Sequence, residues 1–500
     1  MPGPESLTAA DRAQLEECGI PLAEAERQLA LLGGDAAASG TSGAGGAPAA
    51  PRLLRPATVG DGIERIRDEE VPGLLARARE AQRQGRFLKF VPASGAASRM
   101  FRSFAAVAER FPDGSQKSIR AAADKGDTDA REVLDLVARL PAMALGQELE
   151  HRRAGVLTRL ADTTAARDLT PLFGLFFSGD PNGSGLAALP KGLLPFHWAG
   201  DRPRTAFAEQ LAEGQHYLRD ENGESRFHFT VAGEFRSQFT GALEGARRDL
   251  AGGGERLDVA FSEQLPSTHA LALDEAGLPA RTAEGHLLLR PAGHGALLGN
   301  LAATGGDLVF VKNIDNLLPG DRHADVARWK RILAGKLLEV AGTRGGSDSG
   351  GRPWRVCGVV ANSGEPGGGP FWVEGKDGGA SLQIVESAEV AAGDAGQLAL
   401  FRGSTHFNPV DLVVSLRDPA GVPWELERFV DPTRALVAAK SEGGRRLRVY
   451  ERPGLWNGAM AGWNTLFVEV PAWTFAPVKT VLDLARPEHL DPTRLGLRKR

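Results

Sequence analysis

The pattern of apolar and glycine-rich segments predicts an α/β fold, with a twisted, mostly parallel sheet and helices on both of its faces. Strand-like apolar runs alternate with helical stretches from residue 86 onward, and glycine-rich loops separate many of them. Glycine accounts for 63 of the 500 residues, well above the ordinary share of about 7%. Alternating strands and helices are typical of parallel pairing, because each parallel connection has to cross back over the sheet.

The N-terminal residues predict helices followed by a linker. Residues 6–32 have the spacing of two short helices, and Thr8 followed by Asp11 resembles a capping box at the start of the first. Gly19-Ile20-Pro21 breaks the pattern between the two helices. Residues 33–51 are small and nearly uncharged, which predicts a flexible linker.

The remaining chain predicts one α/β domain, residues 86–500, after a helical extension that covers residues 1–85. A further helix near residues 71–84 leads into the first strong strand, at residues 86–92. Residues 101–170 are charged and helical, so we interpret them as an insertion between two sheet elements. Later strand-like runs cover residues 226–231, 286–290, 307–312, 354–360, 381–386, 411–416 and 465–470, with helical stretches such as Glu234–Leu250 and Ala296–Ala303 between several of them.

The composition excludes several classes of protein. The 63 acidic and 59 basic residues give a net charge of −4, whereas a dedicated nucleic-acid-binding protein normally has a basic excess. No uncharged apolar run reaches the ~18 residues that a membrane-spanning helix needs, and the first residues lack the pattern of a signal peptide. Two cysteines, Cys18 and Cys357, are too few for a disulfide framework or a four-thiolate zinc site. We therefore expect a cytoplasmic protein that binds neither nucleic acid nor a membrane.

The loop Val91–Met100 follows the first strand and has the composition of a phosphate-binding loop. In an open α/β sheet, ligands bind beyond the carboxyl ends of the strands, so the loops there are the candidate sites. Ser94, Gly95 and Ser98 are small enough for the backbone to approach a phosphate, and Arg99 offers a bidentate contact. The alternative is a tight turn with an exposed arginine, because the loop matches neither a P-loop nor the dinucleotide-binding fingerprint.

Lysine is scarce, at 11 of the 59 basic residues, so a lysine in an apolar, proline-rich setting is a candidate for function. Lys191 lies between prolines in ALPKGLLPFH, and Lys479 follows a proline in FAPVKTVLDL. A compact ammonium group held in this way suits a phosphate or a developing negative charge. The alternatives are a lysine that extends from a strand edge into solvent and an ordinary loop.

The apolar run DLVFVK ends abruptly in the polar sequence Asn313-Ile314-Asp315-Asn316. A carboxylate at the carboxyl end of a strand is well placed to hold Mg²⁺ against a nucleotide phosphate. We therefore interpret Asp315 as a metal ligand and expect Mg²⁺ as the cofactor. An Asp/Asn-rich turn is the alternative. The ten histidines show no spacing typical of a zinc site.

Three further loops carry polar residues, and none of these loops indicates a function by itself. Gly293-His294-Gly295 lies between a predicted strand and a predicted helix, where the glycines let a flat ligand approach the backbone. Glu386 ends one predicted strand, and Asn408 precedes another. Residues 363–375 are rich in glycine and predict a mobile hairpin or a substrate loop. A helix cap or an ordinary loop is the alternative for each of them.

Together these segments resemble a known family along most of the chain, at about residues 6–490. The segments, in order, are VPASGAASRM, LPKGLLPFH, RPAGHGALLGNL, FVKNIDNLLP, RVCGVVANSGEPGGGPFWV, STHFNPVDLV, PGLWNGAMAGWNTLFVEVP and FAPVKTVLDL. They resemble a bacterial family described as a domain of unknown function. More distantly, the series is similar to the UTP–sugar-1-phosphate uridylyltransferases, which have a glycosyltransferase-A-like, Rossmann-like nucleotidyltransferase core.

The resemblance implies a role for each candidate residue. The implied catalytic groups are Arg99 of the phosphate loop, Lys191 and Lys479; the implied nucleotide contacts are Ser94, Gly95, Ser98, Gly293, His294 and Gly295; the implied substrate contacts are Asn313, Glu386 and Asn408; and Asp315 is the implied metal ligand. The loop departs from the superfamily pattern, because it lacks the usual pair of glycines and the Gly-Thr before its arginine. The interval between Arg99 and Lys191 is also longer than usual, because the helical insertion lies within it.

Three functions are compatible with this pattern. The first is a Mg²⁺-dependent nucleotidyltransferase that joins a nucleoside triphosphate to a sugar-1-phosphate, or to a similar small phosphorylated substrate, with release of pyrophosphate. The second is a nucleotide- or sugar-nucleotide-binding protein without turnover, which the altered glycine loop favours. The third is a glycosyltransferase that uses the same core with a sugar nucleotide as donor.

Overall fold

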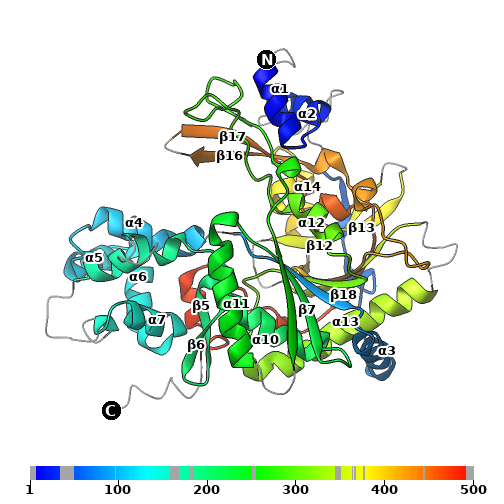
Figure 1. Cartoon of the computed structure of the whole chain (residues 1–500), viewed down its shortest axis with the longest axis horizontal. Helices are drawn as coiled ribbons and strands as arrows, with labels where there is room; N and C mark the ends of the chain where they lie inside the picture. The colour runs from blue at the N-terminus through cyan, green and yellow to red at the C-terminus, as the bar shows by residue number, and fades with distance from the viewer. Residues whose placement is uncertain are drawn as a thin grey trace. The chain divides into compact units, whose positions relative to one another are not determined.

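The structure is a computed structural model of the whole chain, drawn in Figure 1 with the element labels used below. It describes residues 7–33, 50–95, 97–157, 168–178, 185–250, 255–343, 351–362, 364, 367–375, 378–442 and 445–490. Residues 34–49, which make up most of the predicted linker, lie outside the described residues. The same is true of residues 158–167 at the end of the predicted insertion.

The chain divides into two compact units, each built from three segments. Unit 1 comprises residues 1–90, 260–312 and 330–472, and unit 2 comprises residues 91–259, 313–329 and 473–500. The polypeptide therefore passes between the units several times. The boundary predicted between residues 85 and 86 stays a prediction.

The main sheet of unit 1 is mostly parallel, as the sequence predicts. In spatial order its strands are β2 (Thr58–Val59), β3 (Gly62–Glu64), β18 (Asn464–Glu469), β11 (Trp354–Ala361), β15 (Asp411–Ser415), β10 (Leu308–Lys312) and β4 (Phe87–Pro92). β15 is antiparallel to both of its neighbours, whereas the other pairs in this series are parallel. The α/β class and the mostly parallel sheet are confirmed.

The central strands are apolar because they are covered on both faces. All five residues of β10 and all five of β15 are buried, and Val309, Val311, Leu412 and Val414 belong to a core that includes Phe90 and Phe467. Helix α3 (Val71–Arg83), which the sequence predicts, packs closely on α13 (His323–Thr343). A Cβ on Gly335 would lie 2.1 Å from the carbonyl oxygen of Leu74, so only glycine permits this approach.

Helices α1 (Ala9–Glu17) and α2 (Leu22–Gly33) confirm the two helices predicted at residues 6–32. The Thr8–Asp11 capping box is present, and α2 contacts β9 (Ala272–Leu273) and β17 (Arg445–Glu451) of a small sheet. This sheet has the order β16-β17-β9, with β16 at Leu436–Glu442. The N-terminal helices are thus packed against the rest of unit 1 through a local apolar core.

Two predictions about strands need comment. The strand predicted at residues 286–290 is wrong, because Leu287 and Arg290 take part only in isolated bridges to Arg281 and Ala270. Leu287 of this run is instead buried in the core formed with α1 and α2, and Leu289 packs against that core. The glycine-rich residues 363–375 do contribute to a hairpin, in which β12 (Gly368–Glu374) pairs antiparallel with β13 (Ala380–Glu386) and with β1 (Leu53–Pro56).

Unit 2 contains the strands β5 (Pro195–Ala199), β6 (Arg202–Thr205) and β7 (Glu224–Thr230), with helices α10 (Ala206–Leu218) and α11 (Arg236–Leu250) packed together. The predicted insertion is helical, as expected, with α4 (Arg102–Arg110), α5 (Gln116–Asp124), α6 (Thr128–Arg139) and α7 (Ala144–Arg152). In the part of the chain that the structure describes, no helix is both long enough and apolar enough to cross a bilayer.

Candidate active site

The polar loop after β10 is held in a fixed conformation inside unit 2. Gln210, a fully buried residue of α10, donates its Nε2 to the carbonyl oxygens of Asn313 and Ile314, at 2.9 Å and 3.4 Å. The carbonyl oxygen of Asp315 accepts from the amide of Val478 at 2.9 Å. The side-chain Oδ1 of Asn316 accepts from the amide of Ala476 at 3.2 Å. The loop is therefore clamped between α10 and the segment that carries Lys479.

Asp315 forms ion pairs with both of the lysines that the sequence singles out. The Nζ of Lys191 lies 2.8 Å from Oδ2 of Asp315 and also donates to the carbonyl oxygen of Val478 at 2.7 Å. The Nζ of Lys479 lies 3.2 Å from Oδ2 and 3.3 Å from Oδ1. The side chains of Asp315 and Lys191 are 10% and 14% exposed, whereas that of Lys479 is 55% exposed. The cluster is thus closed on the side of Lys191 and open on the side of Lys479.

The charges of this cluster shift the pKa values of its members. Burial alone would raise the pKa of Asp315, but the two ammonium groups outweigh burial and hold this pKa below its usual range. Burial lowers the pKa of Lys191, and the positive charges of Lys479 and Arg99 lower it further, against the opposing effect of Asp315. A second anion beside Lys191 would relieve this cost, so the site favours the binding of an anion.

The predicted phosphate loop lies against the segment that carries Lys191. The amide of Lys191 donates to the carbonyl oxygen of Gly95 at 3.3 Å, and the amide of Ala97 donates to that of Leu189 at 3.0 Å. Ser94, Gly95, Ser98 and Arg99 are exposed, so a ligand can reach them. Although 92 residues separate Arg99 from Lys191 in sequence, unit 2 brings their segments together.

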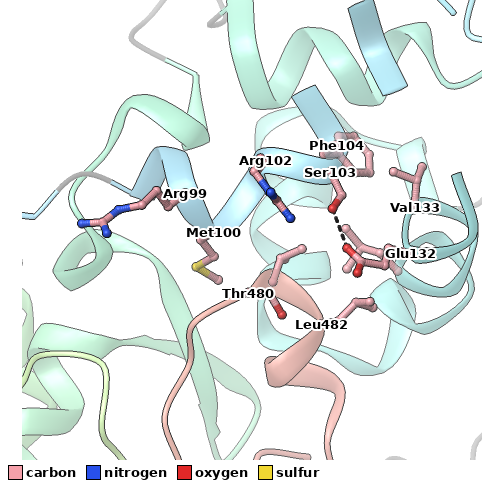
Figure 2. Close-up of a pocket in the computed structure, with 11 residues that line it drawn as sticks. Arg99, Met100, Arg102, Ser103, Phe104, Glu132, Val133, Thr480 and Leu482 are labelled. Carbon is pink, nitrogen blue, oxygen red and sulfur yellow. Dashed lines mark hydrogen bonds between the residues drawn. The ribbon is translucent and has the colours of Figure 1, made fainter. Parts of the chain in front are cut away.

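A small pocket of about 60 Å³ lies beside Arg99, on the side of the helical insertion. Figure 2 shows that Arg102 of α4 is directed toward Thr480, whereas Arg99 is directed away from Thr480. Ser103 donates its hydroxyl to Oε2 of Glu132, a residue of α6, at 2.5 Å. The insertion therefore contributes a wall close to the predicted phosphate loop.

The residues around Asp315 do not fit a divalent cation in this arrangement. Both carboxylate oxygens accept from ammonium groups, and Mg²⁺ prefers oxygen ligands that are free to coordinate it. No group of three or more histidine, cysteine, aspartate or glutamate side chains within the described ranges is arranged to hold a metal ion. The metal role of Asp315 stays a prediction, and the contacts give it the role of a shared counter-ion. The sum of Arg99, Lys191, Lys479 and Asp315 is a formal charge of about +2, which suits phosphate groups.

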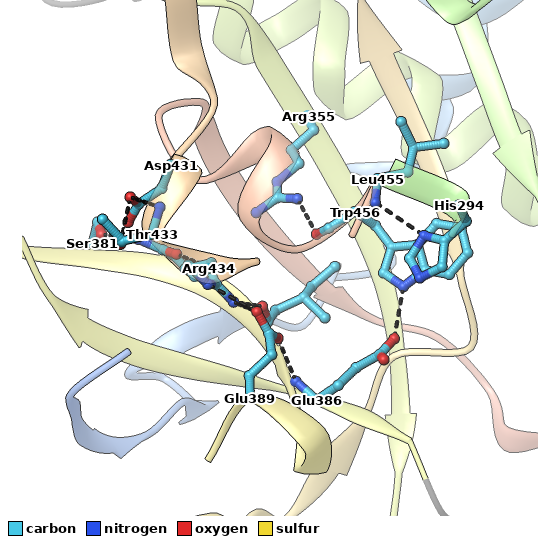
Figure 3. Close-up of polar contacts among 12 residues, drawn as sticks. His294, Arg355, Ser381, Glu386, Glu389, Asp431, Thr433, Arg434, Leu455 and Trp456 are labelled. Carbon is cyan, nitrogen blue, oxygen red and sulfur yellow. Dashed lines mark hydrogen bonds and ion pairs between the residues drawn. The ribbon is translucent and has the colours of Figure 1, made fainter. Parts of the chain in front are cut away.

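The predicted nucleotide and sugar residues of unit 1 meet at one tryptophan, Trp456 (Figure 3). The imidazole of His294 stacks on the indole of Trp456, with 4.0 Å between ring centroids, and its Nδ1 accepts from the amide of Leu455 at 3.0 Å. The indole Nε1 donates to Oε1 of Glu386 at 3.1 Å. His294 and Glu386, 92 residues apart in sequence, are thus linked through Trp456.

Gly293 and Gly295 of this second cluster stand at positions where another residue would be strained or would clash. Gly293 has a φ of +77°, and a Cβ on Gly295 would lie 1.9 Å from the carbonyl oxygen of Pro453. Burial lowers the pKa of His294, while Glu386 and Glu451 act in the opposite direction. The imidazole is therefore held neutral against Trp456, and its role in binding a base stays a prediction.

The two remaining predicted substrate residues have other contacts. The side chain of Asn408 is buried; its Nδ2 donates to the carbonyl oxygen of Gly358 at 3.0 Å, and its Oδ1 accepts from the amide of Val410 at 3.0 Å. These bonds favour a structural role, because Val410 has an unusual φ of +56° that the turn has to support. Asn313 contributes its carbonyl oxygen to Gln210. Their substrate roles stay predictions.

Sequence reasoning missed Gln210 and Trp456. Gln210 lies in the helical sequence AFAEQLAEG, where only the polar pair Glu209-Gln210 on a helix that proves to be buried signals a special role. Trp456 stands in PGLWNGAM, a segment that contributes to the resemblance without an assigned role. Both residues act through contacts with distant segments, which a local pattern does not reveal.

Two solved structures are similar to this one. UDP-N-acetylglucosamine pyrophosphorylase from Trypanosoma brucei, solved with an inhibitor, has a TM-score of 0.52 and 15% identity, over 96% of this chain and 79% of that one. UDP-glucose pyrophosphorylase from Leishmania major (a G45Y mutant with UDP-glucose) has a TM-score of 0.47 and 15% identity, with the same coverage. The first of these likenesses shows that this chain shares the α/β fold of the Trypanosoma brucei protein.

The chain belongs to the family described as Domain of unknown function (DUF4301), whose model matches residues 10–344 and 348–490. This confirms the first resemblance found in the sequence. A search of curated proteins finds no relative of this chain.

Proposed function

We propose that this protein is a nucleotidyltransferase, in which a sugar-1-phosphate or a similar phosphate attacks the α-phosphate of a nucleoside triphosphate and pyrophosphate leaves. The observation that carries the proposal is the convergence of Lys191, Lys479 and the loop of Arg99 around the single carboxylate of Asp315. The fold shared with a UDP-sugar pyrophosphorylase supports it and makes UTP the first nucleotide to test.

Positioning of the substrates and neutralisation of their charges would accelerate the proposed reaction. The attacking phosphate oxygen is already anionic, so no general base is required. Lys191 and Lys479 neutralise the charge that spreads over the equatorial oxygens and the leaving pyrophosphate, and Arg99 adds a bidentate contact. Asp315 and the carbonyl oxygen of Val478 hold the ammonium group of Lys191 in place before substrate binds. Both oxygens of Asp315 already accept from the lysines, so we assign these roles to side chains of this chain and leave Mg²⁺ to the experiment below.

The altered phosphate loop favours one alternative, a protein that binds nucleotides without turnover. Ala93-Ser94-Gly95 and Ala97-Ser98 stand where the superfamily has more glycine, and side chains there restrict how closely a triphosphate approaches the backbone. A glycosyltransferase would use the same basic cluster to stabilise a departing nucleoside diphosphate.

Product analysis tests the proposal directly. The full chain is incubated with UTP, and then with the other nucleoside triphosphates, together with a panel of sugar-1-phosphates, and pyrophosphate is followed with and without Mg²⁺. Pyrophosphate release that depends on both substrates supports the proposal. Free nucleoside diphosphate from a sugar nucleotide would identify a glycosyltransferase instead, and nucleotide binding without any product would identify the binding protein.

A further inference from the structure

A second cavity, of about 800 Å³, lies within unit 2, and none of the predicted site residues lines it. Small residues of α10 and α11, among them Ala208, Ala242 and Gly245, form part of its wall and leave room for a ligand. Trp198 of β5 and His489 also line it. Its volume falls in the range that is usual for small-molecule sites.

A fully buried carboxylate contacts the lining of this cavity. Glu209 of α10 lies next to three basic side chains: His197 Nδ1 at 3.2 Å, His323 Nε2 at 2.9 Å and a terminal guanidinium nitrogen of Arg204 at 3.2 Å. Burial alone would raise the pKa of Glu209, but the two histidines outweigh burial and hold it well below its usual range. Glu209 is therefore an anion that accepts hydrogen bonds and donates none.

A row of contacts leads from Glu209 to His489. The Nδ1 of His197 faces Glu209, and its Nε2 lies 2.9 Å from Nδ1 of His489. The Nε2 of His489 has no hydrogen-bond partner among the described residues.

His489 is 2% exposed and lines the cavity, so its Nε2 is a buried polar atom without a partner. Burial, reinforced by His197 and Arg486, lowers the pKa of His489 to about 3, so the ring stays neutral at physiological pH. A buried polar atom without a partner carries a free-energy cost that a hydrogen bond with a ligand removes.

The rest of the lining indicates the class of ligand. Its charged residues include three arginines and three aspartates, with Arg202 paired to Asp249 at 3.2 Å. Opposite charges in similar number select neither an anion nor a cation. Planar carboxylate and guanidinium groups each match two neighbouring hydroxyls, and an aromatic ring such as Trp198 offers an apolar surface to the C–H groups of a sugar.

We propose that this cavity is a saccharide-binding site, in which the Nε2 of His489 forms a hydrogen bond with a sugar hydroxyl and Trp198 contacts the sugar ring. Trp198 is held for this role, because its Nε1 donates to the carbonyl oxygen of Ala142 at 3.1 Å. The inference does not depend on the proposed function, since it uses neither the lysines nor Asp315.

Binding of neutral sugars to the full chain tests the proposal. Glucose, galactose and N-acetylglucosamine are titrated at millimolar concentrations and followed by calorimetry or by saturation-transfer NMR. We expect at least one of them to bind, and both Trp198→Ala and His489→Phe to weaken that binding by about tenfold or more, which corresponds to about 1.4 kcal/mol, since each removes a contact with the sugar. His489→Gln keeps a hydrogen-bonding group and should retain more affinity than His489→Phe. Trp473→Ala, which removes an exposed tryptophan outside this lining, should change nothing.

Further variants separate this site from the candidate active site. Lys191→Met and Glu386→Ala should leave the binding of the neutral sugar unchanged, even if they abolish nucleotidyl transfer. The melting temperature of each variant without ligand shows whether it is folded, and Trp198→Ala and His489→Phe are independent variants of one site. Absence of sugar binding, or sugar binding that neither of these two variants weakens, would overturn the proposal. Binding of inorganic phosphate or of a diamine that depends on His489, in place of sugar, would overturn it as well.

Discussion

Two buried aspartates, each paired with lysine, differ in a way that separates a structural ion pair from a candidate active site. Asp411 in unit 1 is 6% exposed and is paired with Lys330, which is itself 1% exposed. Asp315 in unit 2 is 7% exposed, but it faces two lysines, one of them 55% exposed. A one-to-one buried pair is neutral, whereas Asp315 with Lys191 and Lys479 keeps one excess positive charge. Burial of an aspartate therefore says little about function, while the ratio and exposure of its partners say more.

The largest expected effect is on stability, and it concerns the neutral pair. Lys330→Met leaves the carboxylate of Asp411 buried without its cation, so we expect a loss of about 3–5 kcal/mol in the free energy of unfolding. Chemical denaturation measures it. The double variant Lys330→Met/Asp411→Leu should recover much of the loss, because it removes both charges together. A single variant as stable as the wild type would show that the two pairs do not differ as argued.

The second effect is on activity and concerns Lys191. Lys191→Met should reduce kcat/KM for pyrophosphate release by about 10²- to 10³-fold, because one charge that faces the transition state is lost. The melting temperature should change little, since Lys479 still neutralises Asp315. Steady-state kinetics and a thermal melt are measured on the same preparation. Lost stability with unchanged turnover would make this cluster structural, like that of Asp411.

Asp315→Asn distinguishes a metal ligand from a counter-ion. Both roles predict a loss of rate of about 30- to 1000-fold for this variant. For the counter-ion, the reason is that two lysines lose the charge that orients them. If Asp315 is a counter-ion, nucleotide binding should weaken equally with and without Mg²⁺. If it is a metal ligand, only the Mg²⁺-dependent part should be lost. Asn316→Ala should do less, since Asn316 accepts a single backbone hydrogen bond through its Oδ1.

The pH dependence of nucleotide binding tests the role of Lys191 in the Asp315 cluster. The pKa of Lys191 is lowered in the free protein, and a bound phosphate would raise it again. Binding then takes up protons, so affinity is full below the lowered pKa and falls as the pH rises through it, at a pH below the ordinary value for lysine. Lys191→Arg stays charged and should remove this phase from the titration. A profile identical in wild type and variant would contradict the argument.

The smallest effect is expected for the predicted linker. Deleting residues 36–50 should leave the melting temperature and the activity nearly unchanged, because the segment has little apolar surface with which to pack. A large fall in the melting temperature would show that the linker interpretation is wrong.

How far the sequence predicts this molecule depends on the range of the contact involved. The capping box at Thr8, the helix at residues 71–84 and the strand DLVFVK follow local rules, and all of them are present. The sequence also singles out Lys191, Asp315 and Lys479, because lysine is scarce and strand ends carry function. It does not reveal that Asp315 faces both lysines, since that depends on how segments 124 and 164 residues away from it fold back.

The strand prediction that failed and the contacts that the sequence did not reveal both depend on packing between distant segments. HLLLR has the composition of a strand, but Leu287 and Leu289 pack in the core that includes the N-terminal helices, and the run forms only isolated bridges. Glu209, His197 and His489 show no spacing that joins them, and only the fold places them in line. In HLLLR, tertiary packing overrode the local strand propensity. For Glu209, His197 and His489, the local sequence carried no signal.

The ties between Lys191, Asp315 and Val478 determine when the candidate active site can exist during synthesis of the chain. Lys191 donates to the carbonyl oxygen of Val478, and Asp315 accepts from the amide of the same residue. Translation proceeds from the N-terminus, so a nascent chain that has not yet reached Val478 has Lys191 and Asp315 but not the backbone that aligns them. Because of the high contact order of the site, an anion that binds this cluster would stabilise the chain only after the segment around Val478 has been synthesised.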